Sequence, residues 1–234
     1  MNVALVLSGG IGSRVGGDIP KQYLHVHGKM IIQYCLETLL AHEKIDAVHI
    51  VAASSWQQDI VNSLERMQWD RSKKIGFSVP GENRQLSIWN GLQDIREYAD
   101  EETTVMIHDA ARPLLSEQMI TECFAALQNH DGVMPVLPMK DTVYTSMDGT
   151  SVSGLLERST IFAGQAPELF CLNRYYGACK ALLPERILKI NGSTEPAILA
   201  GLDIVMIPGD EGNYKITTKE DLERFREKVC GGNE

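Results

Sequence analysis

The chain has 234 residues, 44% of them hydrophobic, so it can bury one sizeable core, and we expect a single domain over residues 1–234. Its formal net charge of −9 argues against a nucleic-acid or anionic-membrane surface, because such surfaces require a concentrated positive field. The five cysteines form no C-x-x-C pair and lie in apolar stretches, which favours core packing over disulfides or zinc. The sequence shows neither a targeting leader nor an apolar run long enough for a bilayer, so we expect a cytoplasmic protein.

Short apolar runs alternate with segments of helical period along most of the chain. The predicted strands, in order, cover residues 3–7, 47–52, 75–79, 104–108, 132–137, 168–171 and 203–207. The predicted helices cover residues 30–42, 56–67, 85–99, 117–127, 173–183 and 219–229. Strands that recur after helices need right-handed crossovers, so we predict a three-layer α/β sandwich with a mostly parallel, twisted sheet.

Residues 140–156 break this alternation. Two short β-prone runs flank Met147-Asp-Gly149, which is a hairpin signal, and no neighbouring helix is available to cover them. An isolated hairpin is marginally stable in water. We therefore predict a protruding β-arm, at about residues 138–158, that packs against another surface such as a second subunit.

A glycine-rich loop follows the first strand. It reads Ser8-Gly-Gly-Ile-Gly-Ser-Arg-Val-Gly-Gly17 and leads to Pro20-Lys-Gln-Tyr23. Glycines at this place let backbone N–H groups approach phosphate oxygens. A Walker A loop is excluded because Gly-Lys-Ser/Thr is absent, and a dinucleotide fingerprint is excluded because Val15 stands where glycine is required. The loop could instead be solvated, with charges that have no role in binding. The presence of Arg14 and Lys21 in one stretch favours two cations directed at one phosphate chain.

Several motifs together resemble one known family. They are SGGIGSR, PKQYL, GENRQLS at residues 81–87, HDAARP at residues 108–113 and YKITTKEDL at residues 214–222. Their order and spacing resemble the methylerythritol phosphate and ribitol phosphate cytidylyltransferases, nucleotidyltransferases with a glycosyltransferase-A-like fold, over essentially the whole chain. The resemblance implies transfer of a cytidylyl group from CTP to a small polyol phosphate, with Mg²⁺ as cofactor, in a homodimer.

The resemblance also implies roles for single residues. Three cations would act on the reacting phosphates: Arg14, Lys21 and Lys215, the last in a short strand before the final helix. The CTP-binding residues would be Ser8, Gly9, Gly10, Gly12, Gly81, Glu82, Ser87 and Asp109. Asp109 would also hold the metal or the ribose. The acceptor phosphate would be bound by Arg112 and, across the dimer, by Thr142 and Arg158.

Ordinary structural roles compete with some of these assignments. Asp109 could cap the turn after its strand, and Lys215 could be a solvated edge residue. Arg158 could pair with Glu157 or lie on the surface, and Arg84 could equally be a helix-start cation or a site residue. His108 is expected to pack or hydrogen-bond locally, because a phosphate nucleophile is largely dianionic near neutrality and needs no general base.

The chain departs from the family pattern near the acceptor. It has Gln165-Ala-Pro-Glu168 where methylerythritol enzymes carry Thr-Pro-Gln, so Ala166 removes one hydroxyl contact. Glu195 is the one candidate acid in the Gly192-Ser-Thr-Glu-Pro196 segment. Ser8-Gly-Gly10, Gly164-Gln165 and Lys215-Ile-Thr-Thr218 resemble the ribitol branch, whereas HDAARP resembles the methylerythritol branch. We favour ribitol 5-phosphate over 2-C-methyl-D-erythritol 4-phosphate. Two alternatives stay open: a nucleotidyltransferase using another NTP and a sugar phosphate, and a nucleotide-binding regulatory domain.

Overall fold

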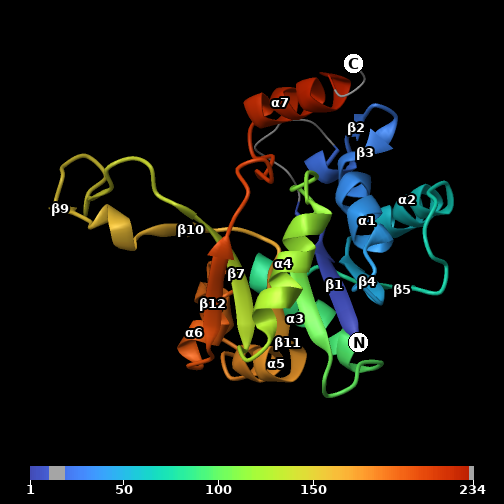
Figure 1. Cartoon of the computed structure of the whole chain (residues 1–234), viewed down its shortest axis with the longest axis horizontal. Helices are drawn as coiled ribbons and strands as arrows, with labels where there is room; N and C mark the ends of the chain where they lie inside the picture. The colour runs from blue at the N-terminus through green and yellow to red at the C-terminus, as the bar shows by residue number, and fades with distance from the viewer. Residues whose placement is uncertain (11–18, 232–234) are drawn as a thin grey trace.

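A mixed eight-stranded sheet is the central layer of the fold, with strand order β10-β7-β11-β6-β1-β4-β5 and β12 beside β7 (Figure 1). The structure is a computed structural model that describes residues 1–10 and 19–231. The strands are β1 (Asn2–Leu7), β4 (Ala47–Val51), β5 (Lys74–Ser78), β6 (Thr104–Asp109), β7 (Gly132–Pro138), β10 (Phe162–Gly164), β11 (Glu168–Cys171) and β12 (Ile204–Pro208). β1 pairs in parallel with β4 and β6, whereas β11 runs antiparallel between β6 and β7.

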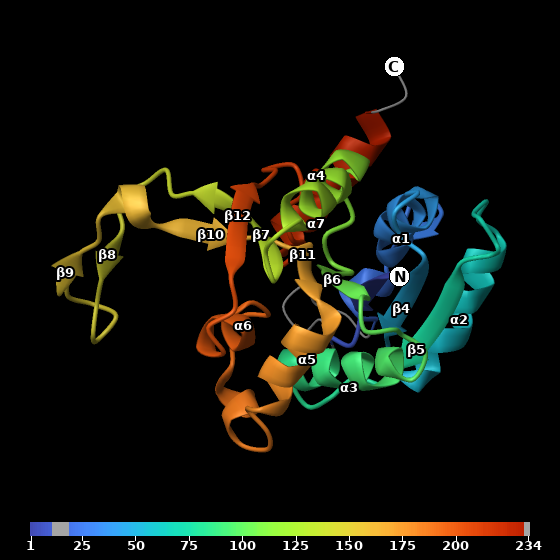
Figure 2. The ribbon, with the colours of Figure 1, turned by 60° about the horizontal axis from the view of Figure 1, so that its bottom comes forward.

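Helices cover both faces of this sheet. The main helices are α1 (Ile31–Ala41), α2 (Ser54–Glu65), α3 (Arg84–Arg96), α4 (Glu117–Leu127), α5 (Leu172–Lys180), α6 (Glu195–Leu199) and α7 (Lys219–Cys230). Alternate residues of β1 enter two different cores: Ala4 and Val6 pack with α1, α2 and α4, whereas Val3 and Leu5 pack with α3 and α5. Figure 2 shows α3 and α5 on one side of the sheet and α4 on the other. The predicted three-layer sandwich is confirmed.

Helix α3 lies unusually close to the sheet. A Cβ atom at Gly91 would stand 2.5 Å from Leu5 Cδ1 and 3.2 Å from Val51 Cγ2, so a side chain there would push the helix away. Asn83 caps the start of α3, its side chain accepting a hydrogen bond from the N–H of Leu86 at 2.8 Å. The helix therefore begins at a fixed height above the carboxyl end of β1.

Every strand and helix of the predicted alternation is present, with ends shifted by at most three residues. The sequence pattern did not predict several short elements: η1 (Lys21–Tyr23), β2 (His25–Val26), β3 (Lys29–Met30), β10, η2 (Arg158–Thr160), η3 (Arg186–Lys189) and α6. The short strand expected around Lys215 is wrong. That segment is irregular, because its Ile216 N–H bonds the Ala111 carbonyl at 2.8 Å without extending into a ladder.

The cysteines are free, and three of them are buried as expected. Cys230 is the exception to core packing: it is exposed in the last turn of α7, where its Sγ lies 2.8 Å from His27 Nε2. In the described part of the chain no helix is long and apolar enough to cross a membrane.

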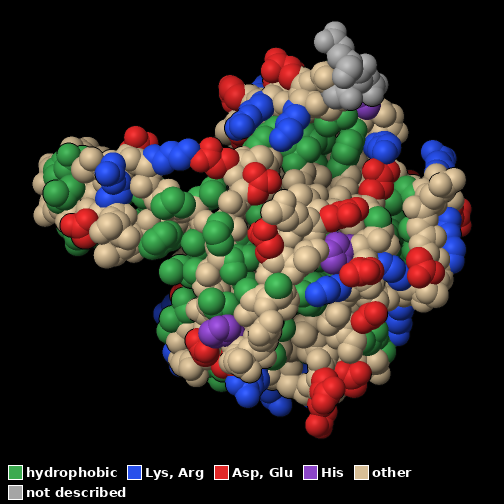
Figure 3. Space-filling model, in the orientation of Figure 1, with side chains coloured by type: hydrophobic (Ala, Val, Ile, Leu, Met, Phe, Trp, Pro, Cys, Tyr) green, Lys and Arg blue, Asp and Glu red, His purple; other side chains and the backbone are tan. Residues whose placement is uncertain are grey.

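The segment between β7 and β10 forms a separate two-stranded sheet from β8 (Tyr144–Thr145) and β9 (Gly154–Leu155). Asp148 Oδ1 organises the loop between them by accepting hydrogen bonds from the N–H groups of Thr150 and Ser151, at 2.8 and 2.7 Å. This hairpin extends away from the central sheet and carries hydrophobic side chains on its surface (Figures 1 and 3). Met147 is 92% exposed and Leu155 66%, so these apolar side chains of the hairpin are not covered by the described part of the chain.

Candidate active site

A cavity of about 560 Å³ opens where β1 and β6 end and α3 begins. It is lined by Leu7, Gly9, Gly10, Lys21, Gln22, Pro80, Gly81, Glu82, Asn83, Arg84, Ser87, Asp109, Ala110, Ala111 and Lys215. Most of the predicted nucleotide-binding residues therefore meet in one place, and Ser8 is buried directly beneath. Gly12 and Arg14 lie outside the described residues.

The Gly81–Ser87 turn forms one wall of the cavity. A Cβ at Gly81 would stand 2.4 Å from Leu86 Cβ and 2.7 Å from its carbonyl carbon, so only glycine permits this close approach. Ser87 Oγ accepts a hydrogen bond from the Gly81 N–H at 3.0 Å and donates to the Asn83 carbonyl at 2.8 Å. The Ser87 hydroxyl thus braces the turn from within.

Asp109 is the centre of a charge cluster in the same cavity. Its Oδ1 accepts from Arg84 Nη2 at 3.1 Å, and its Oδ2 accepts from Lys215 Nζ at 2.9 Å. Arg112 Nε lies 3.8 Å from the same Oδ2. Burial alone would raise the pKa of Asp109, but the cations, Arg84 foremost, outweigh burial and hold this pKa well below its usual range. The carboxylate is therefore ionised.

Arg84 belongs to this cluster and lines the cavity. Its guanidinium comes from the first turn of α3 and reaches a carboxylate 25 positions later in the sequence. A helix-start cation without a partner would face solvent, whereas Arg84 lines the cavity. The signal in the sequence was the shared position of both residues at the same edge of a parallel sheet.

Arg112 lies beside Asp109 but does not line the cavity. Its Nη1 donates to the Asn213 carbonyl at 2.8 Å, which ties the HDAARP segment to the loop before Lys215. His108 is fully buried, and its Nε2 lies 2.9 Å from the Arg112 carbonyl. Burial lowers the pKa of His108 to about 4, so the ring is neutral near pH 7. Local packing and hydrogen bonding of His108 are confirmed.

Thr142 and Arg158 are not brought to this cavity. Both are exposed on the hairpin segment, and Arg158 Nη1 donates to the Lys140 carbonyl at 2.8 Å. Glu195 is also absent from the lining: its carboxylate accepts from the Asn191 N–H at 2.8 Å at the start of α6.

Glu168 is a buried acid that the sequence reasoning did not single out as a site residue. Its carboxylate accepts hydrogen bonds from the hydroxyls of Ser193 and Thr194. Burial raises the pKa of Glu168, opposed chiefly by the charge of Arg84. Its partners stand 25 and 26 positions away, so local pattern could not reveal the cluster.

The acids in the cavity suit a metal that arrives with a phosphate ligand. Among the residues that the structure describes, no group of three or more His, Cys, Asp or Glu side chains could hold a metal ion by itself. Mg²⁺ usually takes one or two carboxylates together with substrate phosphates and water. Asp109, with one carboxylate beside the glycine turn, fits that mode.

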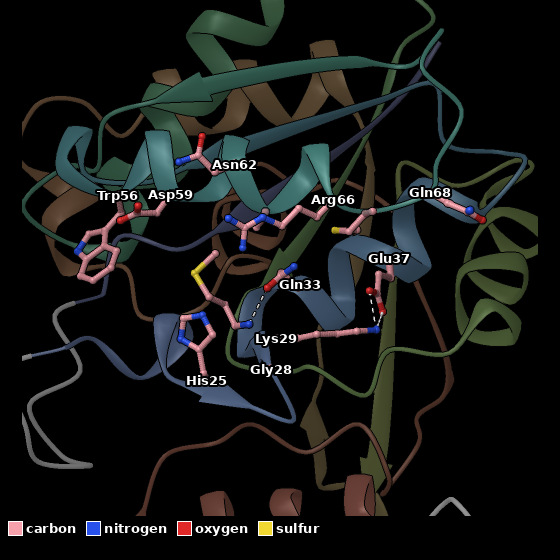
Figure 4. A pocket seen from close by; sticks show the side chains of 13 residues that line it. His25, Gly28, Lys29, Gln33, Glu37, Trp56, Asp59, Asn62, Arg66 and Gln68 are labelled. Atoms are coloured by element: carbon pink, nitrogen blue, oxygen red, sulfur yellow. Dashed lines mark hydrogen bonds and ion pairs between the residues drawn. The ribbon is translucent and has the colours of Figure 1, made fainter.

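A second cavity, also of about 560 Å³, lies between α1, α2 and the β2–β3 turn (Figure 4). Lys29 and Glu37 form an ion pair of 2.7 Å at its rim. Trp56 stands in its wall and stacks on Tyr23, with ring centroids 4.3 Å apart. None of the residues predicted to bind substrate lines this second cavity.

A cavity lined by Gly9 and Gly10 after the first parallel strand, by the Gly81–Ser87 turn and by an acid bound to several cations is typical of nucleotidyltransferases. The profile of the 2-C-methyl-D-erythritol 4-phosphate cytidylyltransferase family (IspD) matches residues 2–227, and the chain belongs to this family.

Relatives with two different names resemble the chain along nearly its whole length. A ribitol-5-phosphate cytidylyltransferase of Streptococcus agalactiae is 29% identical over 97% of this chain and 94% of its own. A 2-C-methyl-D-erythritol 4-phosphate cytidylyltransferase of Neorickettsia sennetsu is 33% identical over 93% and 92%.

Solved structures show the same fold. The 4-diphosphocytidyl-2C-methyl-D-erythritol synthase of Anaerococcus prevotii superposes with a TM-score of 0.82 at 23% identity, covering 98% of this chain and 96% of that one. The 2-C-methyl-D-erythritol 4-phosphate cytidylyltransferase of Francisella tularensis gives 0.79 at 25% identity, covering 96% and 97%.

Proposed function

We propose that this cytidylyltransferase-family chain joins CTP to the phosphate of a small polyol phosphate and releases pyrophosphate. The proposal rests on one observation: a single cavity is lined by Gly9 and Gly10, by Lys21 and by the Asp109–Lys215 ion pair. An acceptor phosphate oxygen attacks the α-phosphorus of CTP, and the bond from that phosphorus to the α,β-bridging oxygen breaks. Such transfers depend on positioning and charge stabilisation, which fixed cations and backbone donors supply.

The triphosphate is assigned to the loop of residues 8–14 together with Lys21 and Lys215. The N–H groups of Gly9 and Gly10 donate no hydrogen bond to any residue that the structure describes, so they are available to phosphate oxygens. Arg14, in the same loop, is assigned to the α-phosphate with Lys21. The cytosine is assigned to the wall formed by Gly81 and Glu82, with Ser87 supporting it.

Asp109 is assigned to Mg²⁺ and the ribose. The ion, when bound with CTP, supplies charge neutralisation between the phosphates. Lys215 Nζ lies 2.9 Å from Asp109 Oδ2, so both side chains stand at the same place in the cavity. The Asp109 carboxylate would hold the ion, and the Lys215 ammonium group would contact the phosphates.

We assign the chain to a cytoplasmic homodimer in which the hairpin of one subunit completes the cavity of the other. The support is the exposed apolar surface of the hairpin, including Tyr144 at 59% and Met147 at 92% exposed. Thr142 and Arg158 are assigned to the acceptor phosphate in the partner's site, with Arg112 on the near side. Their positions on the exposed hairpin, outside their own cavity, support this assignment.

The acceptor assigned here is ribitol 5-phosphate in preference to 2-C-methyl-D-erythritol 4-phosphate. Sequence identity does not distinguish the two acceptors, because relatives of both names are about equally similar to this chain, at 29% and 33% identity. The sequence features of the ribitol branch, Gly164-Gln165 and Lys215-Ile-Thr-Thr218, support the choice, against HDAARP. Sites that hydrogen-bond hydroxyls reject analogues lacking them strongly, so the two acceptors should be well separated.

Pyrophosphate release tests these assignments directly. The protein is incubated with each NTP, Mg²⁺ and both acceptors, and kcat/KM is compared at saturating nucleotide. We expect turnover with CTP, much less with UTP, almost none with ATP or GTP, and none in EDTA. Purine turnover equal to that with CTP would overturn the nucleotide assignment, and a tenfold preference for the methylerythritol acceptor would overturn the acceptor.

A further inference from the structure

Gln22 connects two motifs that are separate in the sequence. Its side-chain amide, Nε2, donates to the backbone carbonyl of Ser8 and to that of Gly10, both at 2.7 Å. The amide of one glutamine therefore holds two carbonyls of the glycine loop. Gln22 is 3% exposed, and its bond to the Ser8 carbonyl is buried, whereas its bond to the Gly10 carbonyl is partly buried at the cavity.

Tyr23 reinforces the same carbonyl. Its hydroxyl donates to the Ser8 carbonyl at 2.9 Å and accepts from Ser8 Oγ at 2.8 Å. The Tyr23 ring is 2% exposed and stacks on Trp56 at a 17° angle, so it has a rigid backing. The orientation of the Ser8–Gly9 peptide is thus set by two buried side chains.

Because the peptide group is planar, the orientation of the Ser8 carbonyl also fixes the direction of the Gly9 N–H. In a planar trans peptide the C=O and the N–H point in opposite directions. The Ser8 carbonyl faces Gln22 and Tyr23 on the buried side, so the Gly9 N–H of the same peptide faces the open side. Gly9 lines the cavity, and its N–H has no acceptor among the described residues.

We propose that Gln22 is a positioning residue: by holding the Ser8 and Gly10 carbonyls inward, it keeps the Gly9 N–H turned toward the CTP triphosphate. The inference rests on the proposed function, because it presupposes a triphosphate at this loop. It adds a residue whose side chain binds backbone rather than nucleotide. Hydrogen bonds from a donor to a charged phosphate are stronger than neutral ones, so their orientation affects affinity for the phosphates specifically.

The test compares ligands that differ only in phosphates. Gln22→Met preserves approximate length and removes both N–H donors. Calorimetric binding of CTP and CMP is measured for the wild-type protein and for this variant, with Mg²⁺. We expect the Kd for CTP to rise by about tenfold or more and the Kd for CMP by less than about twofold. General loosening of the site would weaken both ligands alike.

The matched control is Gln57→Met. Gln57 is a half-buried glutamine whose Nε2 donates to the Ala52 carbonyl at 3.1 Å, away from the cavity lining. It should leave both dissociation constants unchanged. If Gln22→Met does not fold, Tyr23→Phe removes the second donor to the Ser8 carbonyl and should weaken CTP by several-fold without affecting CMP.

The outcomes separate the inference from the function. Wild-type protein that binds CTP, together with variants that bind it equally well or lose CTP and CMP in equal proportion, overturns the role of Gln22 and leaves the cytidylyltransferase intact. Wild-type protein that binds no CTP overturns both.

Discussion

Lys215 Nζ lies 2.9 Å from Asp109 Oδ2, although 106 positions separate the two residues in the sequence. The contact joins the segment before the last helix to the end of a central strand. Arg84 occupies the other carboxylate oxygen, so one buried acid organises cations from distant parts of the chain.

Asp109→Asn should lower the free energy of unfolding at pH 7 by about 1–3 kcal/mol. Removing a buried charge leaves its partners uncompensated, and the usual cost is reduced here because Arg84 and Lys215 are 32% and 36% exposed. The folded pKa of Asp109 is depressed, so its stabilisation is present above the unfolded value of about 3.9 and is lost as the pH falls through the lower folded pKa.

Urea denaturation of wild type and Asp109→Asn between pH 7 and pH 3 measures this effect. The difference between the two proteins should be constant down to about pH 5 and should shrink at lower pH. A difference that is zero at pH 7, or one that persists unchanged at pH 3, contradicts the ion-pair account.

His108→Gln should flatten the pH dependence of stability in a different window. Burial lowers the pKa of His108 to about 4, against about 6.5 in the unfolded chain. Its contribution is complete above pH 6.5 and is lost as the pH falls from there toward 4, at up to about 1.4 kcal/mol per pH unit. Gln can still donate to the Arg112 carbonyl. Denaturation between pH 7 and pH 5 should show a smaller slope for the variant, with His49, whose pKa is also lowered to about 4, supplying part of the remainder. An unchanged slope would exclude His108 as its source.

On the proposed function, Lys21→Ala and Arg14→Ala should each lower kcat by about 10² or more, because each variant would take one positive charge from the reacting phosphate. Steady-state pyrophosphate release at saturating substrates measures this, and thermal unfolding should show little change. Lys180→Ala is a suitable control, since Lys180 is exposed at the end of α5. A variant that keeps the full kcat would show that its residue does not act in the reaction.

Mixing two inactive variants tests the shared site. If Arg158 serves the partner's cavity, combining Arg158→Ala with Lys21→Ala subunits should restore activity, because one cavity of each mixed dimer is then intact. Subunit exchange is verified independently by differently tagged chains. Activity that stays at the level of the separate variants after exchange would place Arg158 in its own chain or outside the reaction.

Most of the fold could be predicted because its central strands β1, β4 and β6 are buried on both faces and read as continuous apolar runs. β10 was missed because Phe162-Ala-Gly164 is exposed and only three residues long. The antiparallel direction of β11 was equally hidden, since a four-residue run carries no sign of which neighbour it will join.

The candidate site was predictable as a set of motifs but not as a set of contacts. Motif order located Asp109 and Lys21 at one edge of the sheet. Three sets of contacts depend on tertiary geometry: the ion pair of Arg84 with Asp109, the hydrogen bonds of Glu168 with Ser193 and Thr194, and the two hydrogen bonds donated by the Gln22 amide. Position in the sequence says nothing of such distances.

Gly91 packs directly against the sheet, and this contact limits where residues can be inserted into α3. Arg84 and Gly91 lie two helical turns apart on the same side of α3, one bound to Asp109 and the other pressed on Leu5. A single residue inserted between them would rotate Arg84 by about 100° and carry it out of reach of its acid. An alanine inserted after Leu86 should therefore abolish turnover, whereas an alanine inserted in the loop between α2 and β5, which does not line the cavity, should preserve it.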